Sequence, residues 1–294
     1  MKPDNRFLDQ PKHFWANVRL VSEQIGYTVR GTGRVRLPAL AEVVSALRTL
    51  GLDTGHLVGG GGKPTTLGRA LLRYFSYRAQ VLNEYVQPRL MTAEQARRQL
   101  EKLQMIPNAS GCPIPMNKQK GEKRAPAYLT GIVNILIHAN AEGLPCDYDP
   151  RRLTTVTGDG APLRTLARRV DGAFPGAINP VAVWEIKEYY YTTTFGSRVA
   201  DGIYESLLDG MELEELREHE SVEVRHYLVV DGRYTWWECG RSYLCRIVDM
   251  LHMGYVDEVL FGSEVIRELP RIVKTWVRLV RERERSGPIS RRRG

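Results

Sequence analysis

The sequence lacks any apolar stretch long enough to cross a membrane. Its first residues have no apolar core of the kind that secretion signals carry. Only four cysteines occur, widely spaced and without a C-x-x-C pair, which argues against a disulfide framework and against a standard zinc knuckle. These absences predict a cytoplasmic protein with reduced thiols and no membrane partner.

Several catalytic patterns are also missing. The six histidines are scattered, with no H-x-H or H-N-H pair, so a ββα-metal nuclease and a histidine-ligated metal site are not expected. No nucleophile elbow or Ser-His-Asp order supports acyl-transfer hydrolysis. The glycine run at residues 59–62 is followed by Lys63 and Pro64, which does not match a phosphate-binding P-loop.

The charge is unevenly distributed along the chain. Residues 1–130 hold 20 Lys and Arg against 9 Asp and Glu, whereas residues 131–294 hold 22 against 25. A basic front half joined to a half with more acids suits a DNA-gripping module attached to a metal-using core. A basic surface that is merely solvated gives the same numbers, so charge alone does not decide.

The segment at residues 181–187 contains the best candidates for catalytic residues. Residues 181–187 are apolar and rich in β-branched residues, which favours a strand. Alternate residues of a strand share a face, so Glu185 and Lys187 lie together while Trp184 faces the other way. Asp171 precedes them by fourteen residues, and we expect a neighbouring strand to bring it beside Glu185. Two carboxylates beside one amine are what a divalent-metal phosphodiesterase site requires; the alternative is a Glu-Lys ion pair at a sheet edge.

Asp171 followed by Glu185-Ile186-Lys187 resembles the signature of the PD-(D/E)XK nuclease superfamily, the fold of most type II restriction endonucleases. The resemblance covers residues 127–230. It departs from the family pattern in having Val170, not proline, before Asp171.

The resemblance implies a fold, an activity and a cofactor. The fold is of the α/β (α+β) class, with an αβββαβ core and a mainly helical N-terminal module. The activity is sequence-specific cleavage of double-stranded DNA with Mg²⁺, for which Mn²⁺ can substitute. Asp171, Glu185 and the carbonyl of Ile186 hold the metal, and Lys187 orients the attacking water. A type II enzyme further implies a homodimer and a cognate DNA methyltransferase encoded nearby. Another repair or phage-defence nuclease, or a DNA-binding protein without catalysis, remains an alternative.

The pattern of apolar residues predicts four segments. Residues 1–105 form a basic, mainly helical module, 106–126 a connector or DNA-contacting loop, 127–285 the catalytic domain and 286–294 a basic tail. Within the catalytic domain we expect helices at 127–141, 197–208, 244–253 and 266–283. We also expect a hairpin of 154–157 with 166–173 and strands at 181–191, 221–230 and 234–239.

Basic residues beside glycines or in the connector are the candidates for DNA contact. An arginine fork or a lysine ammonium reaches phosphate oxygens, and arginine also reaches guanine. The candidates are Arg30, Arg34, Arg36, Lys118, Lys120, Lys123, Arg124 and Arg198.

Overall fold

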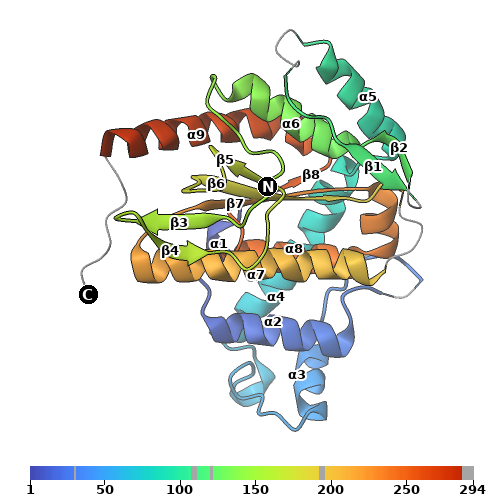
Figure 1. The fold of residues 1–294 in the computed structure, drawn as a ribbon. Coiled ribbons are helices and arrows are strands. Elements are labelled where there is room, and N and C mark those ends of the chain that lie inside the picture. Colours follow the sequence, from blue (N-terminus) through green and yellow to red (C-terminus); the bar gives the residue numbers. More distant parts are fainter. Residues whose placement is uncertain (30, 107–110, 120–121, 192–195, 287–294) are drawn as a thin grey trace.

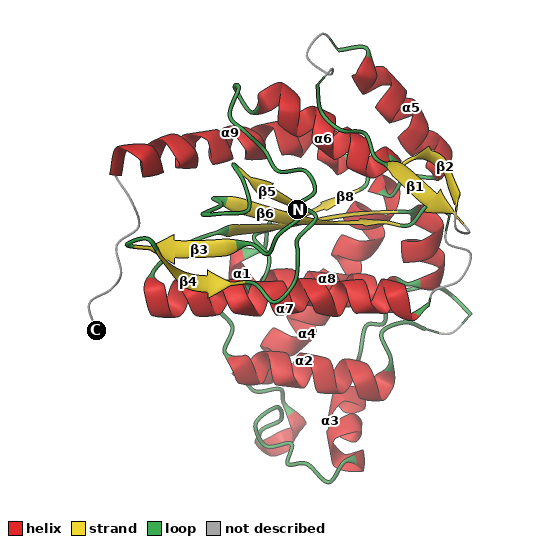
Figure 2. Ribbon diagram, in the orientation of Figure 1, coloured by secondary structure: helices red, strands yellow, loops and turns green. Residues whose placement is uncertain are grey.

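The computed structural model describes residues 1–29, 31–106, 111–119, 122–191 and 196–286. It is a mixed α/β protein in which a four-stranded sheet lies between two layers of helices, with a helical N-terminal part below one layer (Figures 1 and 2). The helices are α1 (Asn5–Leu8), α2 (Lys12–Ile25), α3 (Leu40–Thr49), α4 (Thr66–Gln80), α5 (Ala93–Gln104), α6 (Tyr128–Asn140), α7 (Ser197–Glu220), α8 (Arg241–His252) and α9 (Glu264–Ser286). The strands are β1 (Met116–Gln119), β2 (Glu122–Pro126), β3 (Thr155–Gly158), β4 (Ala161–Thr165), β5 (Gly172–Phe174), β6 (Ala182–Glu188), β7 (Arg225–Asp231) and β8 (Glu258–Phe261).

The main sheet has the order β5-β6-β7-β8. Strand β5 pairs antiparallel with β6, and β6, β7 and β8 run parallel. Helix α7 connects β6 to β7, and α8 connects β7 to β8. Strands covered by helices on both faces need apolar side chains on both, which accounts for the apolar runs at residues 182–184 of β6, 227–230 of β7 and 259–261 of β8.

The two faces of the sheet pack against different helices (Figure 1). On one face, Trp184 of β6 stacks on Trp276 of α9, with ring centroids 5.4 Å apart and planes at 9°. On the other face, Leu228 and Val230 of β7 share a core with residues of α8. Glu185 and Lys187 lie on this second face, which α7 also covers, so the predicted separation of Trp184 from the Glu-Lys pair is confirmed.

Gly172 allows Trp184 to reach its place in the core. A Cβ atom on Gly172 would lie 2.0 Å from a ring carbon of Trp184. We expect Gly172→Ala to lower the free energy of unfolding by about 3 kcal/mol, because the ring has no room to retreat from the added methyl. Urea denaturation measures this loss. Gly176→Ala is the matched control, since a Cβ there meets nothing within 4 Å; equal losses in the two variants would contradict the argument.

Buried ion pairs join the N-terminal part to the sheet domain. Arg78 of α4, 2% exposed, pairs with Asp249 of α8 at 2.9 Å. The amino group of Met1 donates to the carbonyl of Val259 in β8 and pairs with Glu264 at 2.7 Å. Removing one partner of such a pair leaves an unpaired buried charge, so these contacts hold the two parts together.

Most of the predicted helices and the central strand are confirmed. Helix α6 occupies the predicted stretch, and β6 covers the centre of the predicted 181–191 strand. Helix α7 continues to Glu220, well beyond the predicted end at 208, and β8 was not predicted. Within the described residues, no helix has both the length and the apolar character that spanning a membrane requires.

The predicted hairpin of 154–157 with 166–173 is wrong in its second strand. Asp159 and Gly160 both have positive φ, and Gly158 pairs directly with Ala161. A two-residue turn pairs the residues on either side of it, so β4 has to begin at Ala161. The expected αβββαβ order therefore contains one strand more: β3 and β4 form a separate hairpin, and β5 joins β6 in the main sheet.

Two other predicted segments differ from the structure. Residues Tyr234–Cys239, predicted as a strand, form a π-helical turn. Trp236 and Trp237 are adjacent in sequence and both buried, which a strand with one solvent-exposed face cannot achieve. The connector at 106–126, predicted as a loop, contains the antiparallel pair β1 and β2.

Candidate active site

Strands β5 and β6 bring Asp171 and Glu185 together. Gly172 pairs with Trp184, so the preceding Asp171 lies opposite Glu185. The backbone N–H of Asp171 donates to Oε1 of Glu185 at 3.2 Å. The Asp171 carboxylate in turn accepts from the N–H of Ile186 at 2.7 Å. The predicted proximity of the two acids is present in the structure.

Lys187 completes the predicted trio. Its ammonium group lies 2.7 Å from Oε2 of Glu185, and both side chains are buried. Burial by itself lowers the pKa of Lys187, but the charges of Glu185 and Asp171 outweigh it and hold that pKa above its usual value. Lys187 is therefore a fixed cation, suited to orienting a nucleophile and stabilising negative charge rather than to removing a proton.

Sequence reasoning missed two residues of this cluster, Arg168 and Asp209. Arg168 lies before β5 and bridges the acids: its guanidinium is 2.9 Å from Glu185 and 2.6 Å from Asp209. Asp209 belongs to α7 and is fully buried. Glu205, one turn earlier on the same helix, lies 3.4 Å from Arg168 and 3.7 Å from Lys187. The spacing of Glu205 and Asp209, four residues apart on a predicted helix after the strand, was the available signal.

The acids of this cluster differ in their ionisation. Burial raises the pKa of Glu185, but Lys187 and Arg168 outweigh it, so that the pKa stays below its usual value. Burial and the charge of Glu185 raise the pKa of Asp171 to about 6, although that residue as a whole is exposed. The same two causes raise the pKa of Asp209 to about 7. Negative charge in the cluster is thus incompletely neutralised by Lys187 and Arg168.

The side chains of the cluster are of the type that binds a hard divalent cation, but Arg168 is paired with two of the acids. Carboxylate oxygens are the ligands Mg²⁺ prefers. Oδ1 of Asp209 is buried without a hydrogen-bond partner among the described residues, which leaves one oxygen available to a cation. Across the described ranges, however, no three His, Cys, Asp or Glu side chains converge as a metal site requires. The guanidinium of Arg168 lies between Glu185 and Asp209 and pairs with both.

The eight candidates for DNA contact divide into three groups. Arg30 and Lys120 lie outside the described residues. In the N-terminal part, Arg34 is exposed, whereas Arg36 pairs with Glu42 of α3 at 2.9 Å. The remaining four lie on β1, β2 and the first turn of α7: Lys118, Lys123, Arg124 and Arg198.

Strand β2 is connected through α6 to the end of β6. Strand β2 runs into α6, whose first residue, Tyr128, is hydrogen-bonded through its hydroxyl to Tyr191 just after β6. Glu188, on the face of β6 opposite Lys187, accepts from the N–H and hydroxyl of Thr130 in α6. The hairpin β1–β2 and the end of β6 are therefore neighbours, whereas Arg34 and Arg36 lie on a separate part of the chain.

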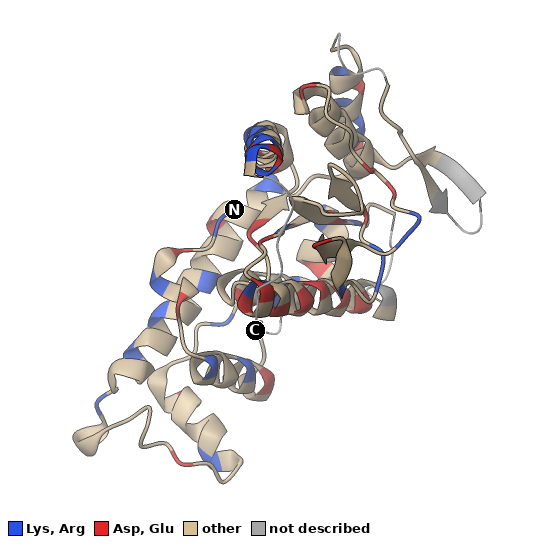
Figure 3. Cartoon of the chain, turned by 60° about the vertical axis from the view of Figure 1, so that its left-hand side comes forward, with Lys and Arg blue, Asp and Glu red and all other residues tan. Residues whose placement is uncertain are grey.

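The helix that covers the site is acidic. Red segments recur along α7 in Figure 3, and its acidic residues are Asp201, Glu205, Asp209, Glu212, Glu214, Glu215, Glu218 and Glu220. A surface of this charge repels phosphate and other anions.

Two family models match the chain. Residues 91–276 match Domain of unknown function (DUF7687), and residues 1–85 match Domain of unknown function (DUF7690). No curated protein and no solved structure matches. The two matched stretches meet between residues 85 and 91, whereas the sequence pattern places a boundary at 105, which stays a prediction.

Proposed function

We propose that this chain, which belongs to the Domain of unknown function (DUF7687) family, is a Mg²⁺-dependent endonuclease that cleaves double-stranded DNA. The contact between Asp171 and Glu185, with Lys187 on the same face of β6, is the observation that carries the proposal. It supports a PD-(D/E)XK-like core formed by α6, β5, β6, α7 and β7.

The residues of the site have distinct tasks in this proposal. Asp171 and Glu185, with the carbonyl of Ile186, would hold Mg²⁺ once Arg168 has released Glu185. The metal would supply charge compensation on the phosphate and a water of lowered pKa. Lys187, kept protonated by the acids around it, orients the water and stabilises the negative charge that develops on the phosphate.

The type II restriction activity is part of the same proposal. Cutting both strands of a symmetric sequence calls for two copies of the site, which favours a homodimer. A methyltransferase encoded beside the gene would protect the host DNA. One observation favours the alternative of DNA binding without catalysis: Arg168 is ion-paired with both Glu185 and Asp209, so a metal ion would have to compete with its guanidinium for these acids.

A cleavage assay with a matched control distinguishes an endonuclease from a DNA-binding protein without catalysis. Phage DNA is incubated with the purified protein in Mg²⁺ or in EDTA, and with Glu185→Gln and Glu188→Gln. We expect discrete fragments from the wild type in Mg²⁺ alone, none from Glu185→Gln, and wild-type cleavage by Glu188→Gln. Glu188 lies on the same strand but faces α6, and a glutamine oxygen still accepts from Thr130.

Binding of DNA without cleavage would reject catalysis. If the wild type binds DNA but leaves it intact in Mg²⁺ and in Mn²⁺, the protein is a DNA-binding module. Melting curves of each variant exclude unfolding as the cause of lost cleavage. If Glu185→Gln still cuts at the wild-type rate, the site is wrongly assigned.

A further inference from the structure

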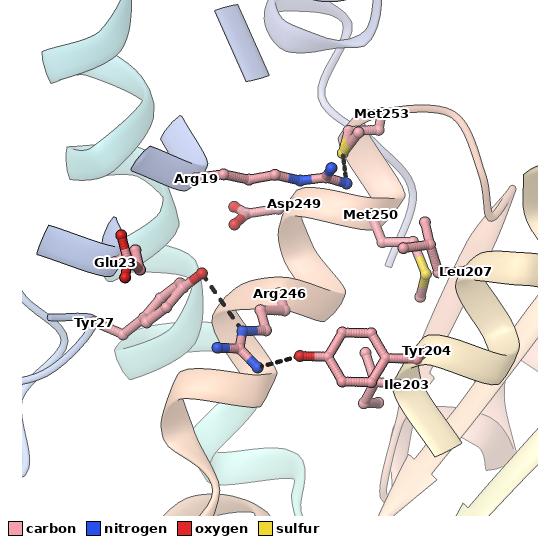
Figure 4. A pocket seen from close by; sticks show the side chains of 10 residues that line it. All are labelled: Arg19, Glu23, Tyr27, Ile203, Tyr204, Leu207, Arg246, Asp249, Met250 and Met253. Carbon is pink, nitrogen blue, oxygen red and sulfur yellow. Dashed lines mark hydrogen bonds between the residues drawn. The ribbon is translucent and has the colours of Figure 1, made fainter. Parts of the chain in front are cut away.

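A cavity of about 310 Å³ lies between the N-terminal part and the sheet domain, and none of the residues that line it belongs to the carboxylate cluster. Its walls come from α2, from Tyr27 just after α2, from α7 and from α8 (Figure 4). The size is at the lower end of the range of small-molecule sites. Ile203, Leu207, Met250 and Met253 supply apolar surface, and Tyr27 and Tyr204 supply two aromatic rings.

Two guanidinium groups reach the cavity without a carboxylate partner among the residues that the structure describes. Arg246 of α8 is held by hydroxyl groups, 2.9 Å from that of Tyr204 and 3.5 Å from that of Tyr27. It also lies over the Tyr27 ring, 5.2 Å from its centroid. Arg19 of α2 enters from the other side and donates to the thioether of Met253 at 3.4 Å, a weak acceptor (Figure 4).

The acids on the wall do not neutralise these arginines. Both oxygens of Asp249 accept from buried Arg78, and one also accepts from the hydroxyl of Tyr74. Glu23 is exposed and accepts from the side chain of Gln24 at 2.9 Å. With Asp249 paired to Arg78, the arginines bring two positive charges to the wall and Glu23 one negative charge. The cavity therefore keeps a net positive charge beside apolar and aromatic surface.

We propose that this cavity binds a nucleotide, with the phosphate on Arg246 and Arg19 and the base against the tyrosine and methionine side chains. Guanidinium groups bind phosphate through charge-assisted hydrogen bonds. Aromatic rings and thioethers offer a flat base a stacking surface. The ligand is a free nucleotide or one nucleotide of a nucleic-acid strand, since both present the same chemistry. Nucleotide binding in this cavity does not require the proposed nuclease activity.

Calorimetric titration in EDTA, which prevents metal-dependent cleavage, tests the proposal. The probes are deoxyadenosine monophosphate, deoxyadenosine, inorganic phosphate and a single-stranded decamer. We expect the monophosphate to bind at least about tenfold more tightly than the nucleoside or phosphate, because it alone uses both parts of the cavity. Arg246→Gln should weaken that binding by about 10- to 100-fold, since one charge-assisted contact is lost.

Further variants separate a binding role from a structural one. Met250→Ala should weaken binding of the monophosphate but leave binding of phosphate unchanged, because it shortens the surface proposed for the base. Glu23→Gln should strengthen binding of the monophosphate by removing a repelling charge. Arg48→Gln, an exposed arginine at the end of α3, is the control and should bind as the wild type does.

The decamer distinguishes the two sources of the ligand. If Arg246→Gln weakens the decamer as it weakens the monophosphate, the cavity receives a nucleotide of a strand. If the decamer is unaffected, the ligand is a free nucleotide. The proposal is overturned if neither probe binds the wild type, or if Arg246→Gln, shown to be folded by its melting curve, binds both as the wild type does.

Discussion

Replacing Asp171 with asparagine is expected to slow DNA cleavage by at least about 1,000-fold, which corresponds to about 4 kcal/mol of transition-state stabilisation. The substitution keeps an oxygen that can accept from the N–H of Ile186 but removes a charge that would hold Mg²⁺. Binding of DNA in EDTA should survive and become about fivefold tighter, because one carboxylate near the phosphate no longer repels it.

Single-turnover cleavage and a filter-binding titration measure these two effects separately. Asp149→Asn is the control: Asp149 is an exposed acid paired with Arg151 at 2.6 Å, and its loss should change neither quantity. A loss of cleavage together with an equal loss of binding would mean that Asp171 supports the fold or the DNA contact. Unchanged cleavage would remove Asp171 from the site.

The sequence predicts the part of the site that lies on one strand. Alternation along β6 places Glu185 and Lys187 on one face and Trp184 on the other, because the period of two is fixed by the backbone. Asp171 was expected on a neighbouring strand, and the structure places it directly before β5, which pairs with β6. The strand before β5 was assigned wrongly. The local sequence pattern is enough to predict which side chains lie together when a single strand or a short turn fixes their positions.

Arg168 and Asp209 could not be found in this way. Their contact depends on how α7 crosses the sheet, since 41 residues separate them in sequence. An aspartate on a helix rich in acids has nothing in its local sequence to distinguish it from its solvated neighbours. Only packing shows that Asp209 is fully buried, whereas Asp201 on the same helix is exposed.

The short strands were missed for a related reason. Strand β8 has only four residues, which are too few for an alternation of apolar and polar side chains to be recognised. Its place at the edge of the sheet follows from the parallel pairing of Tyr227 with Glu258, which the sequence does not encode locally. Strands β1 and β2 are short as well, and the charged residues of β2 are those expected of a solvated loop.

Asp209→Asn is expected to make the protein less sensitive to pH. The pKa of Asp209 rises from its ordinary value of 3.8 to about 7 in the folded protein. Between these values the folded state binds more protons than the unfolded state, so this residue lowers wild-type stability as pH rises through that window. Asparagine resembles the protonated acid and has no such cost. Relative to wild type, the variant should therefore gain about 2–3 kcal/mol in unfolding free energy between pH 5 and pH 8.

Urea denaturation at pH 5 and pH 8, in EDTA, measures the difference between variant and wild type at each pH. Asp201→Asn, an exposed acid on the same helix, is the control and should show almost no pH-dependent gain. Because Asp171 titrates in both proteins, its contribution largely cancels from the comparison. A gain no larger than that of the control would mean that Arg168 keeps Asp209 ionised across this range. Above the pKa of Asp171, the carboxylates of Asp171, Glu185 and Asp209 would then outnumber the two cations of the cluster by one, and this excess negative charge would attract a divalent cation.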